Sequence, residues 1–146
     1  MFAAFNNYTD FSGRANRSEF WLFQLLNMIV IVFSFGIIFA GAGGASLEDY
    51  GHLGSASASF MGGAGLLVFW LLISFIPNMA VTVRRFHDHN ISGWWYLGLA
   101  AVGLIPYIGF LASLATLWVL VRGGTWGPNN YGPDSVNPWR GNTTFA

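Results

Sequence analysis

Charged side chains are missing from long stretches of this chain. Between residues 20 and 83 the only charged side chains are Glu48 and Asp49, and between residues 89 and 121 there are none. Such stretches would aggregate in water, whereas the hydrocarbon core of a bilayer requires them. The sequence therefore predicts an all-α integral membrane protein.

The composition agrees with a membrane location and excludes several kinds of chemistry. Charged residues make up 8% of the chain, against about 25% in soluble domains. Because there is no cysteine, disulfides, thiolate catalysis and cysteine-ligated metal sites are excluded. The formal net charge is zero, so we expect no nucleic-acid partner.

Three apolar segments are long enough to enter a bilayer. Residues 21–40 and 64–83 each supply 20 residues, which as helices are about 30 Å long and match the hydrocarbon thickness. Residues 94–121 supply 28 residues, and one helix of that length would measure about 42 Å. Pro106 and Gly109 interrupt this segment near its middle, so two shorter helices are the alternative to one long helix.

The distribution of arginine favours the two shorter helices. If the N-terminus is cytoplasmic, the arginine-free loop over residues 41–63 lies outside, as the positive-inside rule prefers. A third segment that turns back also brings Arg122 and Arg140 inside, whereas a single crossing would place both outside. Each arm of such a hairpin is short for a full span, which is the argument for the single helix.

We therefore predict one membrane domain over residues 1–146. It contains two full transmembrane helices, a Pro-broken helical hairpin over residues 94–121, a polar loop over residues 41–63 and a cytoplasmic tail over residues 122–146.

Polar residues within the first two spans should face other helices, because lipid offers them no hydrogen bonds. In the first span these residues are Gln24, Asn27 and Ser34, on one helical face. In the second span a stripe of polar side chains runs to the arginines at the helix end: Ser74, Asn78, Thr82 and Arg85. Small residues at four-residue spacing, Gly36, Ala40 and Gly44, would allow close helix approach.

Three polar motifs border the apolar segments. They are Phe11–Trp21 (FSGRANRSEFW), Arg84–Trp95 (RRFHDHNISGWW) and Gly124–Asp134 (GTWGPNNYGPD). In this order, over nearly the whole chain, they resemble the bacterial inner-membrane family known as domain of unknown function 805. Phe86 stands where that family more often has Leu, and Ser135 where Pro often follows the Asp. The resemblance implies a location in the bacterial inner membrane and a multi-pass topology, and it implies no chemistry.

In the hairpin topology all three motifs meet at the cytoplasmic membrane face, where two interpretations apply. In the structural interpretation, arginines pair with acidic groups and tie loops to helix ends. In the functional interpretation, arginines hold a lipid phosphate or an acidic partner. The candidate anion-binding or partner-binding residues are Arg14, Arg17, Arg84 and Arg85, and the candidate polar network comprises Glu19, His87, Asp88, Asn129 and Asp134.

Catalysis and metal binding are the weaker hypotheses. His87, Asp88 and His89 are adjacent, but a metal site needs three or four ligands in suitable geometry, and His52 lies in the opposite loop. We expect no catalytic residue, metal or cofactor, and we favour a non-enzymatic protein with both termini cytoplasmic. The expected partners are membrane lipid and either another membrane protein or further copies of this chain. The alternative is a small intramembrane enzyme or transport subunit centred on His87 and Asp88.

Overall fold

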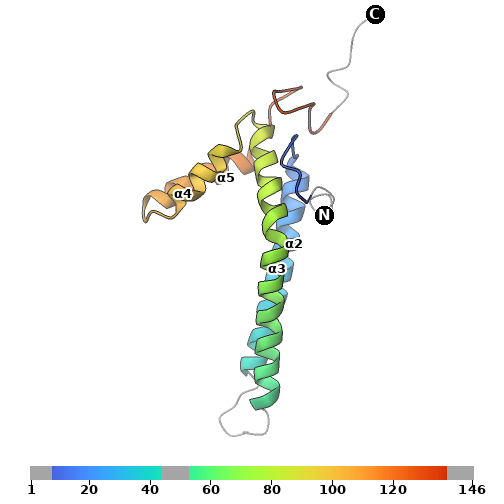
Figure 1. Cartoon of the computed structure of the whole chain (residues 1–146), viewed down its shortest axis with the longest axis vertical. Helices are drawn as coiled ribbons and strands as arrows, with labels where there is room; N and C mark the ends of the chain where they lie inside the picture. The colour runs from blue at the N-terminus through green and yellow to red at the C-terminus, as the bar shows by residue number, and fades with distance from the viewer. Residues whose placement is uncertain (1–7, 44–52, 138–146) are drawn as a thin grey trace, which may run out of the picture. The chain divides into compact units, whose positions relative to one another are not determined.

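The computed structural model describes residues 8–43 and 53–137. Within these ranges it contains four helices, α2 (Arg17–Gly43), α3 (Leu53–Asp88), α4 (Trp94–Gly103) and α5 (Ile108–Val121) (Figure 1). The described residues contain no strand, apart from an isolated bridge between Asn129 and Gly132. The prediction of an all-α protein is confirmed.

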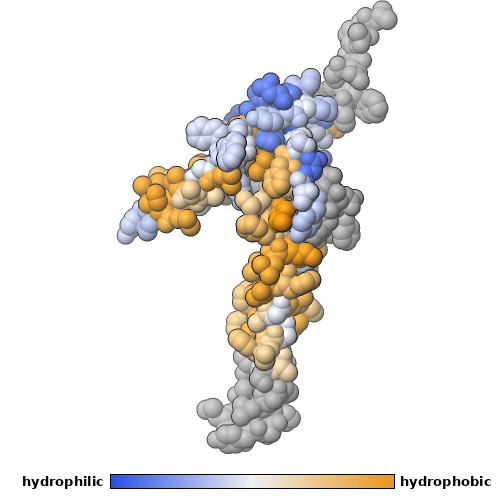
Figure 2. Space-filling model, viewed as in Figure 1, coloured by the Kyte–Doolittle hydropathy of each residue, from blue (hydrophilic) through white to orange (hydrophobic). Residues whose placement is uncertain are grey.

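Two of the helices are long and apolar enough to cross a membrane, over Arg17–Gly41 and Ala58–Asp88. Apolar side chains cover these helices and the hairpin, while hydrophilic side chains gather around the loops at the end of α3 (Figure 2). Helix α3 begins at Leu53, so residues 53–63 are helical where we expected loop. The physical reason is that a helix satisfies its own backbone hydrogen bonds, which apolar surroundings require even of a Gly- and Ser-rich segment.

The contacts divide the chain into two compact units, Gln24–Ile76 and the combination of Met1–Phe23 with Pro77–Ala146. In the first unit, the Asn27 side chain accepts a hydrogen bond from the Trp70 indole N–H at 3.0 Å. Ser34 is fully buried, and its hydroxyl donates to the Val30 carbonyl. The polar face predicted for the first span therefore lies against protein at these positions.

Close helix approach in this unit depends on Gly63 rather than on Gly36. A Cβ atom at Gly63 would lie 2.9 Å from the Ser34 carbonyl oxygen and 2.7 Å from the Ile38 side chain, whereas a Cβ at Gly36 would meet open space. The four-residue spacing that begins at Gly36 therefore does not mark this contact, and Gly44 lies outside the described residues. The backbone of α3 passes so near α2 that only glycine fits there.

The second unit joins the N-terminal segment, the end of α3, the hairpin and the polar tail. Phe20, Phe23 and Val81 are buried together with Ala15, and the half-buried Leu120 packs against them. The Ala15 N–H donates to the Arg84 carbonyl at 3.1 Å, which fixes the segment before α2 on the last turns of α3.

Residues 94–121 form a hairpin of two short helices that pack on each other. Helices α4 and α5 contain 10 and 14 residues, or about 15 and 21 Å, so neither spans a hydrocarbon core of about 30 Å. Within its unit, the hairpin leaves the end of α3 at a steep angle (Figure 1). The prediction of a hairpin is confirmed.

The turn of the hairpin is tight. Tyr107 has a φ of 67°, and the Gly109 N–H donates to the Ile105 carbonyl at 2.8 Å. A Cβ atom at Gly109 would lie 2.3 Å from the Gly103 carbonyl oxygen. Backbone meets backbone at this point, and neither side can yield without opening the turn.

We expect Gly109→Ala to destabilise the protein by about 1–3 kcal/mol, because the added methyl group overpacks the turn. The matched control is Gly98→Ala in α4, where an added Cβ meets nothing within 4 Å and alanine favours the helix. Thermal unfolding in detergent, followed by circular dichroism, measures both. A midpoint for Gly109→Ala at or above that of Gly98→Ala would show that the hairpin turn is not close-packed.

Candidate functional site

The site is built on the C-terminal end of α3. Asn90 has a φ of 59°, its N–H donates to the His87 carbonyl, and the Ile91 N–H donates to the Phe86 carbonyl. This pattern is a Schellman motif, which stops a helix sharply. Asp88 is the last residue of α3, so its side chain and free carbonyl are presented to the loops.

The polar tail donates hydrogen bonds to two carbonyls at this helix end. Both the N–H and the hydroxyl of Thr125 donate to the Asp88 carbonyl, at 2.8 and 3.0 Å. The Asn129 side-chain amide donates to the His87 carbonyl at 2.9 Å and to the Thr125 hydroxyl at 3.0 Å. The tail thereby satisfies the Asp88 carbonyl, which the helix end leaves without an internal partner, and adds a second donor to the His87 carbonyl.

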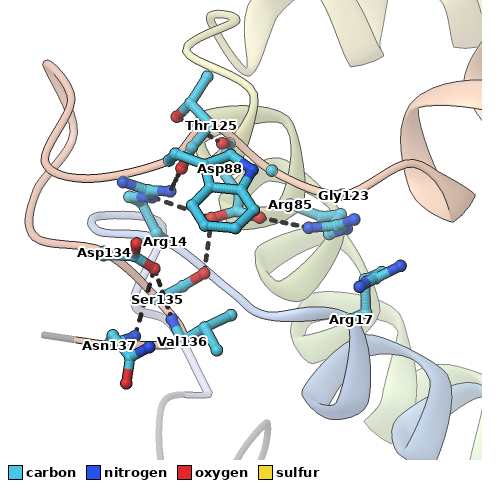
Figure 3. Close-up of a pocket in the computed structure, with 12 residues that line it drawn as sticks. Arg14, Arg17, Arg85, Asp88, Gly123, Thr125, Asp134, Ser135, Val136 and Asn137 are labelled. Atoms are coloured by element: carbon cyan, nitrogen blue, oxygen red, sulfur yellow. Dashed lines mark hydrogen bonds and ion pairs between the residues drawn. The ribbon is translucent and has the colours of Figure 1, made fainter.

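The Asp88 carboxylate lies between two arginines that come from different segments. Its Oδ1 accepts from Arg14 Nε at 2.9 Å and from the Ser135 hydroxyl at 2.7 Å, while its Oδ2 accepts from Arg85 Nη1. The side chains of Arg14, Arg85 and Asp88 are at most 2% exposed. The carboxylate is therefore committed to structural bonds and is not free to act as a base (Figure 3).

Both arginines also bind backbone carbonyls. Arg14 donates from Nη1 to Gly127 and from Nη2 to Thr125, each at 2.6 Å. Arg85 donates from Nε to the Leu120 carbonyl at 3.3 Å and from Nη2 to that of Arg122. The planar guanidinium group, with donors on three nitrogens, suits such binding of several acceptors at once. Arg14 and Arg85 thereby tie the N-terminal segment, α3, α5 and the tail together.

Gly124 packs directly against the Asp88 carboxylate. A Cβ atom at this position would lie 1.9 Å from Asp88 Oδ2, whereas a Cβ at Gly123 would meet nothing within 4 Å. The Gly123-Gly124 pair therefore has one position that the packing requires to be glycine.

Arg84 and Glu19 form a separate pair. Arg84 Nη2 lies 2.9 Å from Glu19 Oε1, and the two side chains are 4% and 16% exposed. The backbone N–H of Glu19 donates to the Asn16 side chain at 2.7 Å. Asn16 thereby caps the start of α2. Of the predicted charged residues, the structure thus brings Arg14, Arg85 and Asp88 together as a buried triad, and it pairs Arg84 with Glu19 separately.

His87 lies on the tail rather than in a ligand set. Its ring stacks on that of Tyr131, with the centroids 3.9 Å apart and the planes 5° from parallel. Its Nδ1 lies 3.3 Å from the Gly13 carbonyl oxygen. Residues 8–43 and 53–137 contain no group of three His, Cys, Asp or Glu side chains that could hold a metal ion.

Asp134 organises the tail. Its side chain accepts from the N–H groups of Gly127, at 3.0 Å, and of Val136 and Asn137, at 2.9 and 3.3 Å. These backbone donors hold the pKa of Asp134 below its ordinary value, because they stabilise the ionised carboxylate. The carboxylate therefore remains charged at neutral pH.

A pocket of about 310 Å³ opens beside the triad. Arg17 lines it from the first turn of α2 and is exposed; its side chain lies at the same edge of the pocket as Arg85 (Figure 3). Among the residues that the structure describes, Arg17 makes no ion pair. The lining comprises Arg14, Arg17, Arg85, Asp88, Asp134 and the segments 123–126 and 135–137.

Three residues of this site were not among those selected from the sequence. Thr125 caps the end of α3, Ser135 binds Asp88, and Tyr131 stacks on His87. Two of them lie inside the third motif and Ser135 directly follows it, so the motif was the available signal. The sequence of a turn does not indicate which distant residue its uncharged side chains will contact.

We expect Asp88→Asn to lower the free energy of unfolding by about 3–5 kcal/mol, because it leaves two buried guanidinium groups without a counter-charge. The matched control is Glu19→Gln, which removes the acid from a single, more exposed pair and should cost less. Denaturant unfolding in detergent compares the two variants. Equal losses would contradict the central place of Asp88.

Comparison with known proteins places the chain in a family. A family model described as "Protein of unknown function (DUF805)" matches residues 8–133. The inner membrane protein YhaH of Escherichia coli (strain K12) is 37% identical over 130 residues, which cover 88% of each chain. The inner membrane protein YhaI of the same strain is 34% identical over 128 residues, which cover 88% of this chain and 87% of that protein.

No solved structure matches this chain. The family model covers all three polar motifs almost to their ends, and both relatives are named for the inner membrane. The membrane location inferred from the apolar helices agrees with those names, and the chain is a member of the DUF805 family of inner membrane proteins.

Proposed function

We propose that this protein is a non-enzymatic, multi-pass inner-membrane protein whose polar end binds the phosphate of an anionic phospholipid. The observation that carries the proposal is the difference between Arg17 and the other arginines of the pocket. Arg14 and Arg85 are occupied by Asp88 and by backbone carbonyls, whereas Arg17 is exposed at the pocket.

The charges around the pocket support an anionic ligand. Three arginines face two aspartates there, so one positive charge has no counter-charge, and it belongs to the accessible Arg17. A guanidinium group can bind two phosphate oxygens at once. Because Arg17 begins one of the helices long enough to cross the membrane, lipid headgroups are the phosphates nearest to it.

We further propose that both termini are cytoplasmic. The charge pattern supports this orientation, because a hairpin after α3 returns the chain to the side on which α3 ends, and the loop between α2 and α3 has no arginine. Arg14, Arg17, Arg84, Arg85 and Arg122 then share the cytoplasmic side. Arg140, which lies outside the described residues, would join them.

Orientation can be tested cleanly because the chain has no cysteine. We expect Ser46→Cys, between α2 and α3, to react with a membrane-impermeant maleimide when the outer face of the inner membrane is exposed. Thr143→Cys should react only after the inner membrane is opened. Labelling of both cysteines from outside would contradict a cytoplasmic C-terminus.

Binding at Arg17 is tested with short-chain phosphatidylglycerol and, as the zwitterionic control, phosphatidylcholine of the same chain length. We expect detergent-purified protein to bind the anionic lipid more tightly, and Arg17→Gln to weaken that binding by about fivefold, the effect of one arginine charge near a lipid surface. Arg17→Lys should restore part of it. Equal binding of both lipids by the wild type, or no effect of Arg17→Gln, would overturn the proposal.

A further inference from the structure

A second feature, separate from the Arg17 pocket, lies where the hairpin meets the end of α3. An apolar groove of about 610 Å³ runs between α4 and α5, within the range of about 300–1,000 Å³ typical of ligand pockets. The groove is lined by Phe86 and Val119, which are buried, and by Trp95 and Trp118, which are exposed. The remaining lining residues, Ile91, Leu99 and Ala115, are also apolar.

Arg122 lies at the edge of this groove. The Arg122 guanidinium carbon lies 4.6 Å from the centroid of the Trp118 ring, and this cation–π contact holds the charge beside the lining. Arg122 is exposed, and among the described residues it has no acidic partner. An apolar groove with one unpaired cation at its edge complements an acyl chain joined to an anionic headgroup.

The position of Arg122 is fixed by the buried triad. Its carbonyl accepts from Arg85 Nη2, and its N–H donates to the Trp118 carbonyl at 3.1 Å. The guanidinium group therefore extends from backbone that is anchored on both sides, which lowers the entropic cost of ordering it on a ligand.

We propose that this groove holds one acyl chain of an anionic phospholipid, with the lipid phosphate bound by Arg122. The two short helices favour lipid as the occupant, because neither spans the bilayer and both carry exposed apolar side chains. In α5 these side chains continue to Val121, the residue before Arg122. This arrangement sets the chain-binding groove at the depth of the acyl chains and Arg122 at the headgroups. The inference is independent of phosphate binding at Arg17.

The probe is phosphatidylglycerol with a photoactivatable diazirine in one acyl chain, incorporated into vesicles with the full-length protein. After irradiation, the labelled residues are mapped by peptide mass spectrometry. We expect labelling to be enriched at Leu99 and Ala115 in the groove over Leu97 and Leu111, which are exposed on the same two helices and lie outside the groove. Non-specific solvation by lipid would label all four alike and would overturn the inference.

The variants separate this site from the Arg17 pocket. Arg122→Gln should lower groove labelling by about fivefold, on the basis of one arginine charge near a lipid surface, and the same lipid with a phosphocholine headgroup should label the groove of the wild type correspondingly less. Arg17→Gln should leave groove labelling unchanged.

Besides equal labelling of all four residues, two further results would overturn the groove site. One is groove labelling that does not fall with Arg122→Gln, whether or not it falls with Arg17→Gln. The other is a groove that remains unlabelled, which would mean that protein, such as a second copy of this chain, covers it. Groove labelling that depends on Arg122, together with phosphatidylglycerol binding that Arg17→Gln leaves unchanged, would instead reject only the function proposed above.

Discussion

The carboxylate of Asp88 accepts bonds from two buried arginines, and the arrangement of the polar end depends on it. One arginine comes from the segment before α2 and the other from the last turn of α3. Each arginine also binds carbonyls of the tail or of the end of α5. A single acidic group thus holds four segments that are distant in the sequence.

The use of arginine follows from this geometry. Lysine presents a compact charge, whereas a guanidinium group can meet a carboxylate and two carbonyls in one plane. Arg14 makes three such bonds, and the single nitrogen of a lysine could not reach the carboxylate and both carbonyls from the same positions. Every guanidinium nitrogen of Arg14 and Arg85 already donates a bond, whereas Arg17 and Arg122 are the exposed arginines among residues 8–43 and 53–137.

The two proposed lipid contacts are consistent with this division. Arg17 lies at a polar pocket and Arg122 at an apolar groove. Arg17 closely follows Arg14, which binds Asp88, and the carbonyl of Arg122 accepts from Arg85. The histidine and aspartate that first suggested catalysis are occupied differently: Asp88 by arginines and Ser135, and His87 by stacking on Tyr131. Rigid, fully bonded polar residues are suited to holding a binding surface in place.

The sequence alone determined the membrane class and the two long helices, and it favoured the hairpin over a single long helix. These follow from one-dimensional quantities: the length of each uncharged run, the proline and glycine that interrupt the third run, and the positions of the arginines. It also identified most residues of the polar end, because charged residues are so few that those beside the spans must find partners.

Only the tertiary structure decided which partner each charge has. The sequence allowed Asp88 to pair with any nearby arginine, and the fold assigns it Arg14 and Arg85 while Glu19 pairs with Arg84. The close helix contact likewise lies at Gly63 rather than at Gly36, and α3 begins at Leu53 rather than at residue 64. Pairing and close approach depend on the distance between segments far apart in the chain, and no local pattern of residue types encodes that distance.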